Sequence, residues 1–300
     1  MPGRMEGKKT VVVGAGQLES ELLGNGRAIA ARFAREGAEV CAVDFVESRG
    51  QATVDEIRDD GGTAHLIVAD VSQSEDCARL VAESHEAMGR IDVLVNVVGI
   101  NHHDGTPLTL EEGSWHHIMD VNFKAMWLTS KAVLPIMQEQ GGGAITNIST
   151  VGSKTGGGRL FAYAMSKAGV NELTHFIAVS YAPWNIRCNV VLPAFVITPH
   201  SFDGLLEAGY VVDEQQYYEL GRKSVPLGRM GNAHDVENAV LFLSSEEANF
   251  ITGVELPVDG GSLAIIGQFQ RPPDAPPLTT TWHESHGLRA VHTSGRAHDG

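Results

Sequence analysis

The sequence is short of cysteine and of long apolar runs, and each shortage excludes a class of protein. Only three of the 300 residues are cysteines, and the scatter of Cys41, Cys77 and Cys188 fits neither a metal site nor a redox pair. No apolar run approaches the roughly 20 residues of a membrane span, and the first residues contain no apolar signal core. We therefore expect a cytoplasmic protein with reduced cysteines, no metal and no membrane anchor.

Basic residues are also scarce. The 22 lysines and arginines face 37 acidic residues, which gives a net charge of −15. Nucleic acids and anionic membrane surfaces both attract basic patches, so neither is an expected partner. What the sequence does contain is 43% hydrophobic residues and 34 glycines, which is typical of a globular protein with many tight turns.

Apolar runs alternate with amphipathic stretches from about residue 9 to residue 260. Strands are predicted at residues 10–13, 39–43, 64–68, 91–95, 144–147, 186–192 and 254–258, and helices at 27–35, 48–60, 74–88, 111–138, 161–181 and 235–244. This order indicates an α/β fold, a single doubly wound Rossmann-type domain with a parallel sheet of about seven strands and helices on both faces. Pro135 is expected to bend or end the long helix at 111–138.

Two segments stand outside this alternation. Residues 199–226 have no simple period and are rich in Gly, Tyr, Asp and Glu, which indicates a mobile lid or a small helical insertion over a substrate. After Gly267 the composition shifts to proline, threonine and histidine. We therefore predict one folded domain over residues 1–267 and an irregular tail over 268–300, which could instead wrap a partner subunit.

The most informative local pattern is a tyrosine and a lysine four residues apart. Tyr163 and Lys167 lie one turn apart on one face of the predicted helix at 161–181. A free phenol has a pKa of about 10, and a nearby ammonium favours the phenolate and lowers that pKa. Such a phenol suits proton exchange with an alcohol or a ketone. The alternative is a surface tyrosine above a surface lysine, because the pattern is short.

A glycine-rich turn joins the first predicted strand to the first predicted helix. Gly14-Ala-Gly16 and Gly24-Asn25-Gly26 would let backbone N–H groups approach a pyrophosphate at the start of that helix. Asp44 ends the second strand 18 residues after Gly26, close to the spacing at which a carboxylate binds the adenosine ribose. A carboxylate there repels a 2′-phosphate, so NAD is favoured over NADP. A plain aspartate at a strand end is the alternative.

These motifs and others resemble the short-chain dehydrogenase/reductase family, in its variant with an extended glycine-rich loop, over about residues 8–262. The resemblance rests on Gly14, Gly24, Gly26, Asp70, Asn96, Gly99, Asn122, Asn147 to Thr150, Tyr163, Lys167, Pro193, Thr198 and Val258 to Gly261. It implies an NAD-dependent oxidoreductase that interconverts a secondary alcohol and a ketone, with small-molecule substrates. It also implies a homotetramer or homodimer formed through the helices at 111–138 and 161–181.

The resemblance assigns the catalytic residues. Tyr163 is the general acid or base, Lys167 lowers its pKa and holds the nicotinamide ribose, and Asn122 holds a water that connects the lysine to solvent; the alternative for Asn122 is a purely structural bond at a helix bend. The family's serine stands thirteen residues before the tyrosine, and that position holds Thr150. Ser149 is the alternative if the strand is bulged, and Ser153 is a third candidate.

The resemblance also assigns the cofactor contacts. Asp70 and Val71 would meet the adenine, Gly99 would let the backbone approach, and Ile197 and Thr198 would bind near the carboxamide. The full cofactor-binding set is Gly14, Gly16, Gly24, Asn25, Gly26, Asp44, Phe45, Asp70, Val71, Asn96, Val97, Gly99, Tyr163, Lys167, Pro193, Ile197 and Thr198.

The sequence departs from the family pattern at three places. Val13 replaces a threonine, and six extra residues lengthen the loop at 15–23, whose Glu19 and Glu21 are expected to point outward. Ala194 replaces a glycine, and Thr150 replaces the serine.

The substrate is the least determined part. His102 and His103 follow the fourth strand and could line the pocket mouth, although two loop histidines are more often solvated. Phe195, Trp115 and the apolar residues between 202 and 210 indicate an apolar site for an alcohol or ketone of moderate size. Two other functions stay open on this fold: a non-catalytic NAD-binding sensor, which would not need Tyr163, and an epimerase or dehydratase relative.

Overall fold

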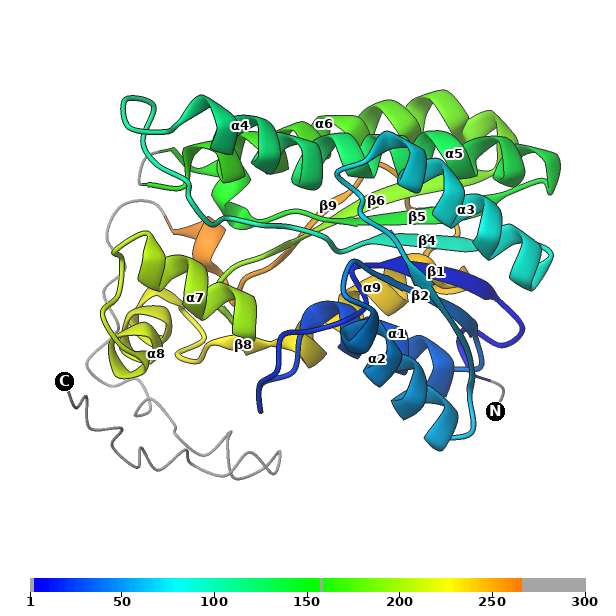
Figure 1. The fold of residues 1–300 in the computed structure, drawn as a ribbon, viewed down its shortest axis with the longest axis horizontal. Helices are drawn as coiled ribbons and strands as arrows, with labels where there is room; N and C mark the ends of the chain where they lie inside the picture. The colour runs from blue at the N-terminus through cyan, green and yellow to red at the C-terminus, as the bar shows by residue number, and fades with distance from the viewer. Residues whose placement is uncertain (1–2, 157–158, 266–300) are drawn as a thin grey trace.

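The sheet has the parallel, doubly wound order that the alternation predicts. The computed structural model describes residues 3–156 and 159–265 and forms a seven-stranded parallel sheet in the order β3-β2-β1-β4-β5-β6-β9 (Figure 1). Its strands are β1 (Lys9–Val13), β2 (Glu39–Asp44), β3 (Thr63–Val68), β4 (Val93–Asn96), β5 (Gly143–Ile148), β6 (Ile186–Pro193) and β9 (Glu255–Val258). The strand order reverses between β1 and β4, and in such sheets ligands bind at the carboxyl ends of the strands beside this point.

Helices cover both faces of the sheet. They are α1 (Asn25–Arg35), α2 (Glu47–Asp59), α3 (Ser74–Met88), α4 (Glu112–Met119), α5 (Ala125–Glu139), α6 (Phe161–Tyr181), α7 (Pro199–Glu207), α8 (Glu214–Ser224) and α9 (Ala233–Ser244). Figure 1 shows α3 to α6 on one face and α1, α2 and α9 on the other. The predicted fold class is therefore confirmed, and the tail predicted at 268–300 lies outside the described residues.

Alternate side chains of each strand belong to two separate cores, because successive residues of a strand point to opposite faces. Val12 of β1 joins the core that includes Ile29 and Phe33 of α1, whereas Val11 and Val13 join the core on the α3, α5 and α6 face. These strands are apolar on both sides because neither face meets water.

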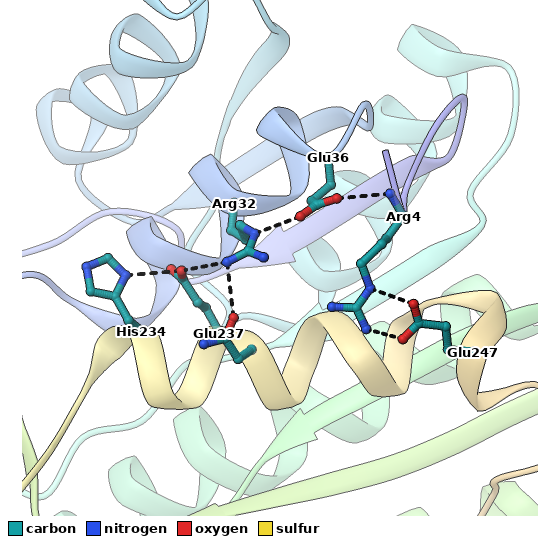
Figure 2. A network of polar contacts seen from close by, with 7 residues as sticks. Arg4, Arg32, Glu36, His234, Glu237 and Glu247 are labelled. Carbon is teal, nitrogen blue, oxygen red and sulfur yellow. Dashed lines mark hydrogen bonds and ion pairs between the residues drawn. The ribbon is translucent and has the colours of Figure 1, made fainter. Parts of the chain in front are cut away.

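Polar contacts also hold α1 against α9, as Figure 2 shows. Arg32 of α1 bonds Glu36, the C-cap residue of that helix, and reaches Glu237 of α9, which also contacts His234. Arg4 extends this connection by pairing with Glu247 after α9. The helix that follows the glycine-rich turn is thereby fixed to α9, its neighbour on the same face of the sheet.

The long helix predicted at 111–138 is broken, but not where it was expected. Pro135 lies inside α5, which continues to Glu139, so the helix does not end at the proline. The neighbouring buried residues Val133, Leu134 and Met137 hold that turn in place despite the missing N–H. The break is a π-helical turn at Asp120–Lys124 between α4 and α5, which carries Asn122.

The segment at 199–226 forms helices α7 and α8, which is the insertion alternative of the sequence prediction. A small parallel pair of β7 (Val196–Ile197) and β8 (Gly231–Asn232) closes its base. Figure 1 places both helices at the end of the domain beyond the main sheet. Thr198 begins α7 with a reciprocal capping box to Ser201, so this helix start had a readable sequence signal.

Candidate active site

Tyr163 and Lys167 stand at the beginning of α6, beside the carboxyl ends of β4 and β5. The Lys167 ammonium is buried and donates to the carbonyl oxygens of Val98 at 3.0 Å and Ile148 at 2.9 Å. Burial lowers the pKa of Lys167 to about 7. These two carbonyls fix the lysine at the point where the two strands end.

The tyrosine pKa moves in the direction opposite to the one the sequence suggests. Burial raises the pKa of Tyr163 to about 12, although a hydrogen bond with Thr150 acts to lower it. The expectation of a depressed phenol pKa is therefore wrong for this structure. The reason is desolvation, which disfavours the phenolate, while Lys167 directs its charge to two backbone carbonyls.

The three candidate hydroxyls after β5 point in different directions. Thr150 bonds the phenol of Tyr163, accepts from the Gly152 N–H at 3.2 Å and donates to the Pro193 carbonyl at 3.4 Å. Ser149 is buried and donates to the backbone carbonyl of Lys167 at 3.0 Å. Ser153 donates to the Thr150 carbonyl. Of the three, the structure brings Thr150 to the tyrosine.

Asn122 holds the loop after β4. Its Oδ1 accepts from the Ile100 N–H at 2.8 Å, and its Nδ2 donates to the Ile100 carbonyl at 2.8 Å and to the Ser166 hydroxyl at 3.1 Å. Gly99 thereby sits over the lysine, where an added Cβ would lie 3.2 Å from the Lys167 nitrogen. The asparagine is fully buried and joins the π-helical turn to the loop and to α6.

The glycine-rich turn leaves room for a phosphate. Gly14 has a φ of +88°, and a Cβ on Gly26 would overlap the Gly14 carbonyl oxygen. Gly24 is the N-cap of α1 and brings no side chain, and the first turn of α1 contains no acidic residue. The buried Oδ1 of Asn25 has no partner in the described part of the chain. α1 has no side-chain cap, so the N–H groups of its first turn and the positive end of its dipole fit a dinucleotide pyrophosphate.

The extended loop folds back on itself and then onto the helical insertion. Gln17 accepts from the Gly24 N–H at 2.8 Å and donates to the Leu22 carbonyl at 3.4 Å. Leu22 packs against the apolar cluster of Ile197, Val211, Tyr217 and Met230. Glu19 and Glu21 are exposed, as expected, so their charges are turned to solvent.

Comparison with known proteins agrees with this geometry. Residues 23–262 match the family model described as Enoyl-(Acyl carrier protein) reductase. The 7alpha-hydroxysteroid dehydrogenase of Clostridium sardiniense is 35% identical over 265 residues, which cover 86% of this chain and 94% of that protein. The chain belongs to the short-chain dehydrogenase/reductase family.

Two solved structures of similar proteins contain a nicotinamide cofactor. Carveol dehydrogenase from Mycobacterium avium, in complex with NAD, is 30% identical with a TM-score of 0.81 over 88% of this chain and 100% of its own. A protein of Beutenbergia cavernae that holds NADP at low occupancy is 34% identical with a TM-score of 0.78, again over 88% and 100%. This short-chain dehydrogenase/reductase is thus similar to proteins that hold either cofactor.

In this family member, Asp44 and Arg49 meet at the turn that would receive the ribose. The Asp44 carboxylate accepts from the Gly16 N–H at 2.9 Å and from the Val46 N–H at 3.0 Å. A Cβ on Gly16 would come within 2.7 Å of both the Asp44 carboxylate and the Cβ of Arg49. The Asp44 carboxylate and the Cβ of Arg49 therefore both lie against Gly16. Phe45, next along the chain, is exposed.

Several of the other predicted cofactor residues already have structural partners. Asp70 accepts from the Ser72 N–H at 3.0 Å, and its neighbour Val71 is buried. The buried Asn96 side chain donates to Asn147 at 2.9 Å and accepts from Thr129 at 2.9 Å, so its polar atoms are used within the protein. The remaining predicted contacts, Val97, Pro193, Ile197 and Thr198, lie at or just after the ends of β4 and β6.

Sequence reasoning missed Asp104 and His200. Asp104 accepts from the backbone N–H groups of Ala162 at 3.0 Å and Tyr163 at 2.8 Å, and so caps α6 from another part of the chain. No spacing rule links residues so far apart. His200 stands in the first turn of α7, which the sequence left as irregular.

A separate polar hollow lies at the opposite edge of the sheet, where β4, β5 and β6 begin. Its charged groups already have partners: Lys8 pairs with Glu246, Arg90 pairs with Asp92, and Arg187 donates to backbone carbonyls. It lies away from Tyr163 and Lys167, so we assign the chemistry to the carboxyl edge. In the described residues, no group of three or more His, Cys, Asp or Glu is placed to hold a metal, and no helix is long and apolar enough to cross a membrane.

Proposed function

We propose that the chain is an oxidoreductase that interconverts a secondary alcohol and a ketone, with NAD as the hydride carrier. Membership of the family supports an oxidoreductase. The observation that carries the proposal is the place of Tyr163 and Lys167 in the first turns of α6, with Lys167 bound to the carbonyls of Val98 and Ile148 and Thr150 beside the phenol. Bound NAD would accept the hydride from the alcohol or, reduced, supply it to the ketone.

The protein groups would move the proton and hold the reacting oxygen. With a pKa of about 12, Tyr163 is protonated at neutral pH and can donate its proton to the oxygen of a ketone. In the reverse direction the same phenol oxygen accepts the alcohol proton. The Thr150 hydroxyl, which bonds this phenol, would donate to the substrate oxygen as negative charge develops there.

Lys167 and Asn122 would support this exchange. Lys167, with a pKa near 7, is able to take up and release a proton at neutral pH, and it lies one helical turn from Tyr163. Asn122 holds the loop that covers the lysine through both backbone groups of Ile100. We therefore propose that Asn122 acts by holding this loop in place over Lys167.

We propose NAD rather than NADP, on the ground that the Asp44 carboxylate would repel a 2′-phosphate and accept from the ribose hydroxyls. Arg49 beside it is the specific observation that favours the alternative, since a guanidinium pairs with phosphate. The assembly is proposed to be a homodimer or homotetramer, and the cytoplasmic location stays a prediction of the sequence.

The experiment is a screen of secondary alcohols with NAD and of ketones with NADH, followed by nicotinamide absorbance. Tyr163→Phe is the matched control, because it keeps the ring and removes only the hydroxyl. Turnover by the wild type that the variant loses supports the proposal. A protein that binds NADH but turns over no substrate would be a sensor, and product formation without net NADH change would favour an epimerase or dehydratase.

A further inference from the structure

The loop after β4 and the helix α7 meet beside the lysine. His200 in α7 lies close enough to Lys167 and His102 for their charges to act on it. The rings of His102 and His200 meet edge to face with centroids 5.9 Å apart. Gly204, one turn after His200 on the same face of α7, packs so tightly on Asn101 that an added Cβ would overlap the asparagine amide. Asn101 and His200 therefore border the same space.

Each of these two residues has a buried polar atom without a partner. Within residues 3–156 and 159–265, neither the Nε2 of His200 nor the Oδ1 of Asn101 has a hydrogen-bond partner. Asn101 is only 7% exposed. Buried polar atoms are nearly always paired, because an unpaired one loses its bonds to water and gains nothing in return. Two such atoms beside the proposed reaction centre indicate that a bound ligand supplies their missing hydrogen-bond partner.

The geometry points to His200 and Asn101 as the residues that bind a second oxygen of the substrate, next to the carbon that reacts. The substrate class is then a diol or hydroxyketone without a charge at that position. This inference rests on the proposed function, because it takes Tyr163 and Thr150 as the groups that hold the first oxygen.

The chemistry of the two atoms fits a hydroxyl. Burial, with the charges of His102 and Lys167, lowers the pKa of His200 to about 4, so the imidazole is neutral at neutral pH. A neutral imidazole nitrogen either donates or accepts, and an amide oxygen only accepts. A substrate hydroxyl can donate to the Asn101 oxygen while its own oxygen accepts from the His200 nitrogen. Two neutral groups do not compensate a carboxylate, so an uncharged oxygen is preferred.

Glu207 keeps this arrangement in place. Its carboxylate accepts from the His103 N–H at 2.7 Å and bonds the His102 ring at 2.7 Å. The last residue of α7 is thereby tied to the loop that carries Asn101. The bonds of Glu207 and the contact of Gly204 with Asn101 therefore join the helix to the loop next to the two unpaired atoms.

The test compares 1,2-cyclohexanediol with cyclohexanol, which lacks the second hydroxyl. We expect the wild type to favour the diol in kcat/KM with NAD. His200→Phe keeps an aromatic ring against His102 and removes the nitrogen. It should lower kcat/KM for the diol about tenfold more than for cyclohexanol, the effect of one lost hydrogen bond. His200→Gln restores a polar side chain and should recover part of this ratio.

A control and a binding measurement separate the possible failures. His85→Ala removes an exposed imidazole on α3, away from α7 and the loop after β4, and should leave the diol-to-cyclohexanol ratio unchanged. Calorimetry with the same two alcohols and the NADH-loaded protein measures selection without turnover. Preferential binding of the diol that His200→Phe removes, with no oxidation, would keep this inference and overturn the proposed function. Oxidation of both alcohols with a ratio that His200→Phe leaves unchanged would overturn the inference alone.

Discussion

The carboxylate of Asp104 accepts a hydrogen bond from the backbone N–H of Tyr163, 59 residues later in the chain and 2.8 Å away. Its other oxygen accepts from the N–H of Ala162 at 3.0 Å. α6 has no capping side chain of its own, because its N-cap is Leu160. A negative group at a helix N-terminus binds the free N–H groups there and interacts favourably with the helix dipole. Asp104 therefore fixes the turn that presents the tyrosine.

Removing this cap should weaken both the fold and the activity. We expect Asp104→Ala to lower the free energy of unfolding by about 1–2 kcal/mol and to reduce kcat more than it raises the KM for NADH. Asp104→Asn keeps an acceptor oxygen, so its stability and its kcat should lie between those of the wild type and of Asp104→Ala. Urea unfolding and steady-state kinetics measure these effects, with Asp55→Ala, at an exposed position of α2, as the control. An Asp104→Ala protein with normal kcat would contradict the positioning role.

Substitutions of Thr150 and of Ser149 should have different effects on kcat and on stability. Loss of the Thr150 hydroxyl removes a bond to Tyr163, so Thr150→Ala should lower kcat by about 10²–10³-fold, as for other donors that stabilise a developing oxyanion. Thr150→Ser should keep most of the activity. Ser149→Ala instead loses a buried bond to the Lys167 carbonyl and should cost about 1 kcal/mol of stability with a smaller change in kcat. A larger kcat loss from Ser149→Ala would reverse the assignment.

Cofactor choice can be measured by titrating the protein with NADH and NADPH. Asp44→Ala should weaken NADH binding about tenfold, since hydrogen bonds to a charged group are strong, and should relax discrimination against NADPH. Arg49→Ala should leave NADH binding close to that of the wild type. If the wild type prefers NADPH and Arg49→Ala removes that preference, the arginine determines the choice and the Asp44 assignment is wrong.

The lowered pKa of Lys167 should make the free energy of unfolding increase with pH. Its pKa is about 7 in the folded protein and 10.5 ordinarily, so between these values the unfolded chain binds more protons. Stability should therefore rise from about pH 7 to 10.5, with a contribution from this group of up to about 1.4 kcal/mol per pH unit. The pKa of Tyr163 is raised from 10.0 to about 12, so here the folded protein binds more protons. This group should therefore lower stability as the pH rises from 10 to 12. Urea unfolding of wild type and Lys167→Met between pH 7 and 10.5 checks the first slope, which the variant should lack.

Exposed apolar side chains on α5 and α6 give a test of assembly. Phe176 and Val179 of α6 are 70% and 79% exposed, and Trp127 of α5 is also exposed. Such side chains gather where subunits meet. Phe176→Glu should shift a dimer or tetramer toward a smaller species in light scattering after size-exclusion chromatography. The control is Phe250→Glu, which changes an exposed phenylalanine outside both helices. A wild-type monomer would contradict the proposal.

The regular elements were predictable because their patterns are local. The bounds of α6 and α3 follow from the apolar period and the glycines or loops beside them, and both match the prediction. The π-helical turn at Asn122 was not predictable, because the side chain of Asn122 bonds Ile100 in the distant loop after β4, a contact that no local pattern indicates. Asp104 and His200 were missed for the same reason. Their roles arise from contacts across the fold, and no period or motif in the sequence records them.

Leu22 has a consequence for kinetics. It belongs to the loop beside the proposed phosphate site, and it packs on the apolar cluster of Ile197, Val211, Tyr217 and Met230, which includes residues of α8 and of the α7–α8 connection. A loop with such a contact cannot swing open alone, because α7 and α8 would have to release Leu22 first. We therefore expect an ordered reaction, in which the alcohol or ketone departs before the dinucleotide and exchange of the dinucleotide limits the turnover rate.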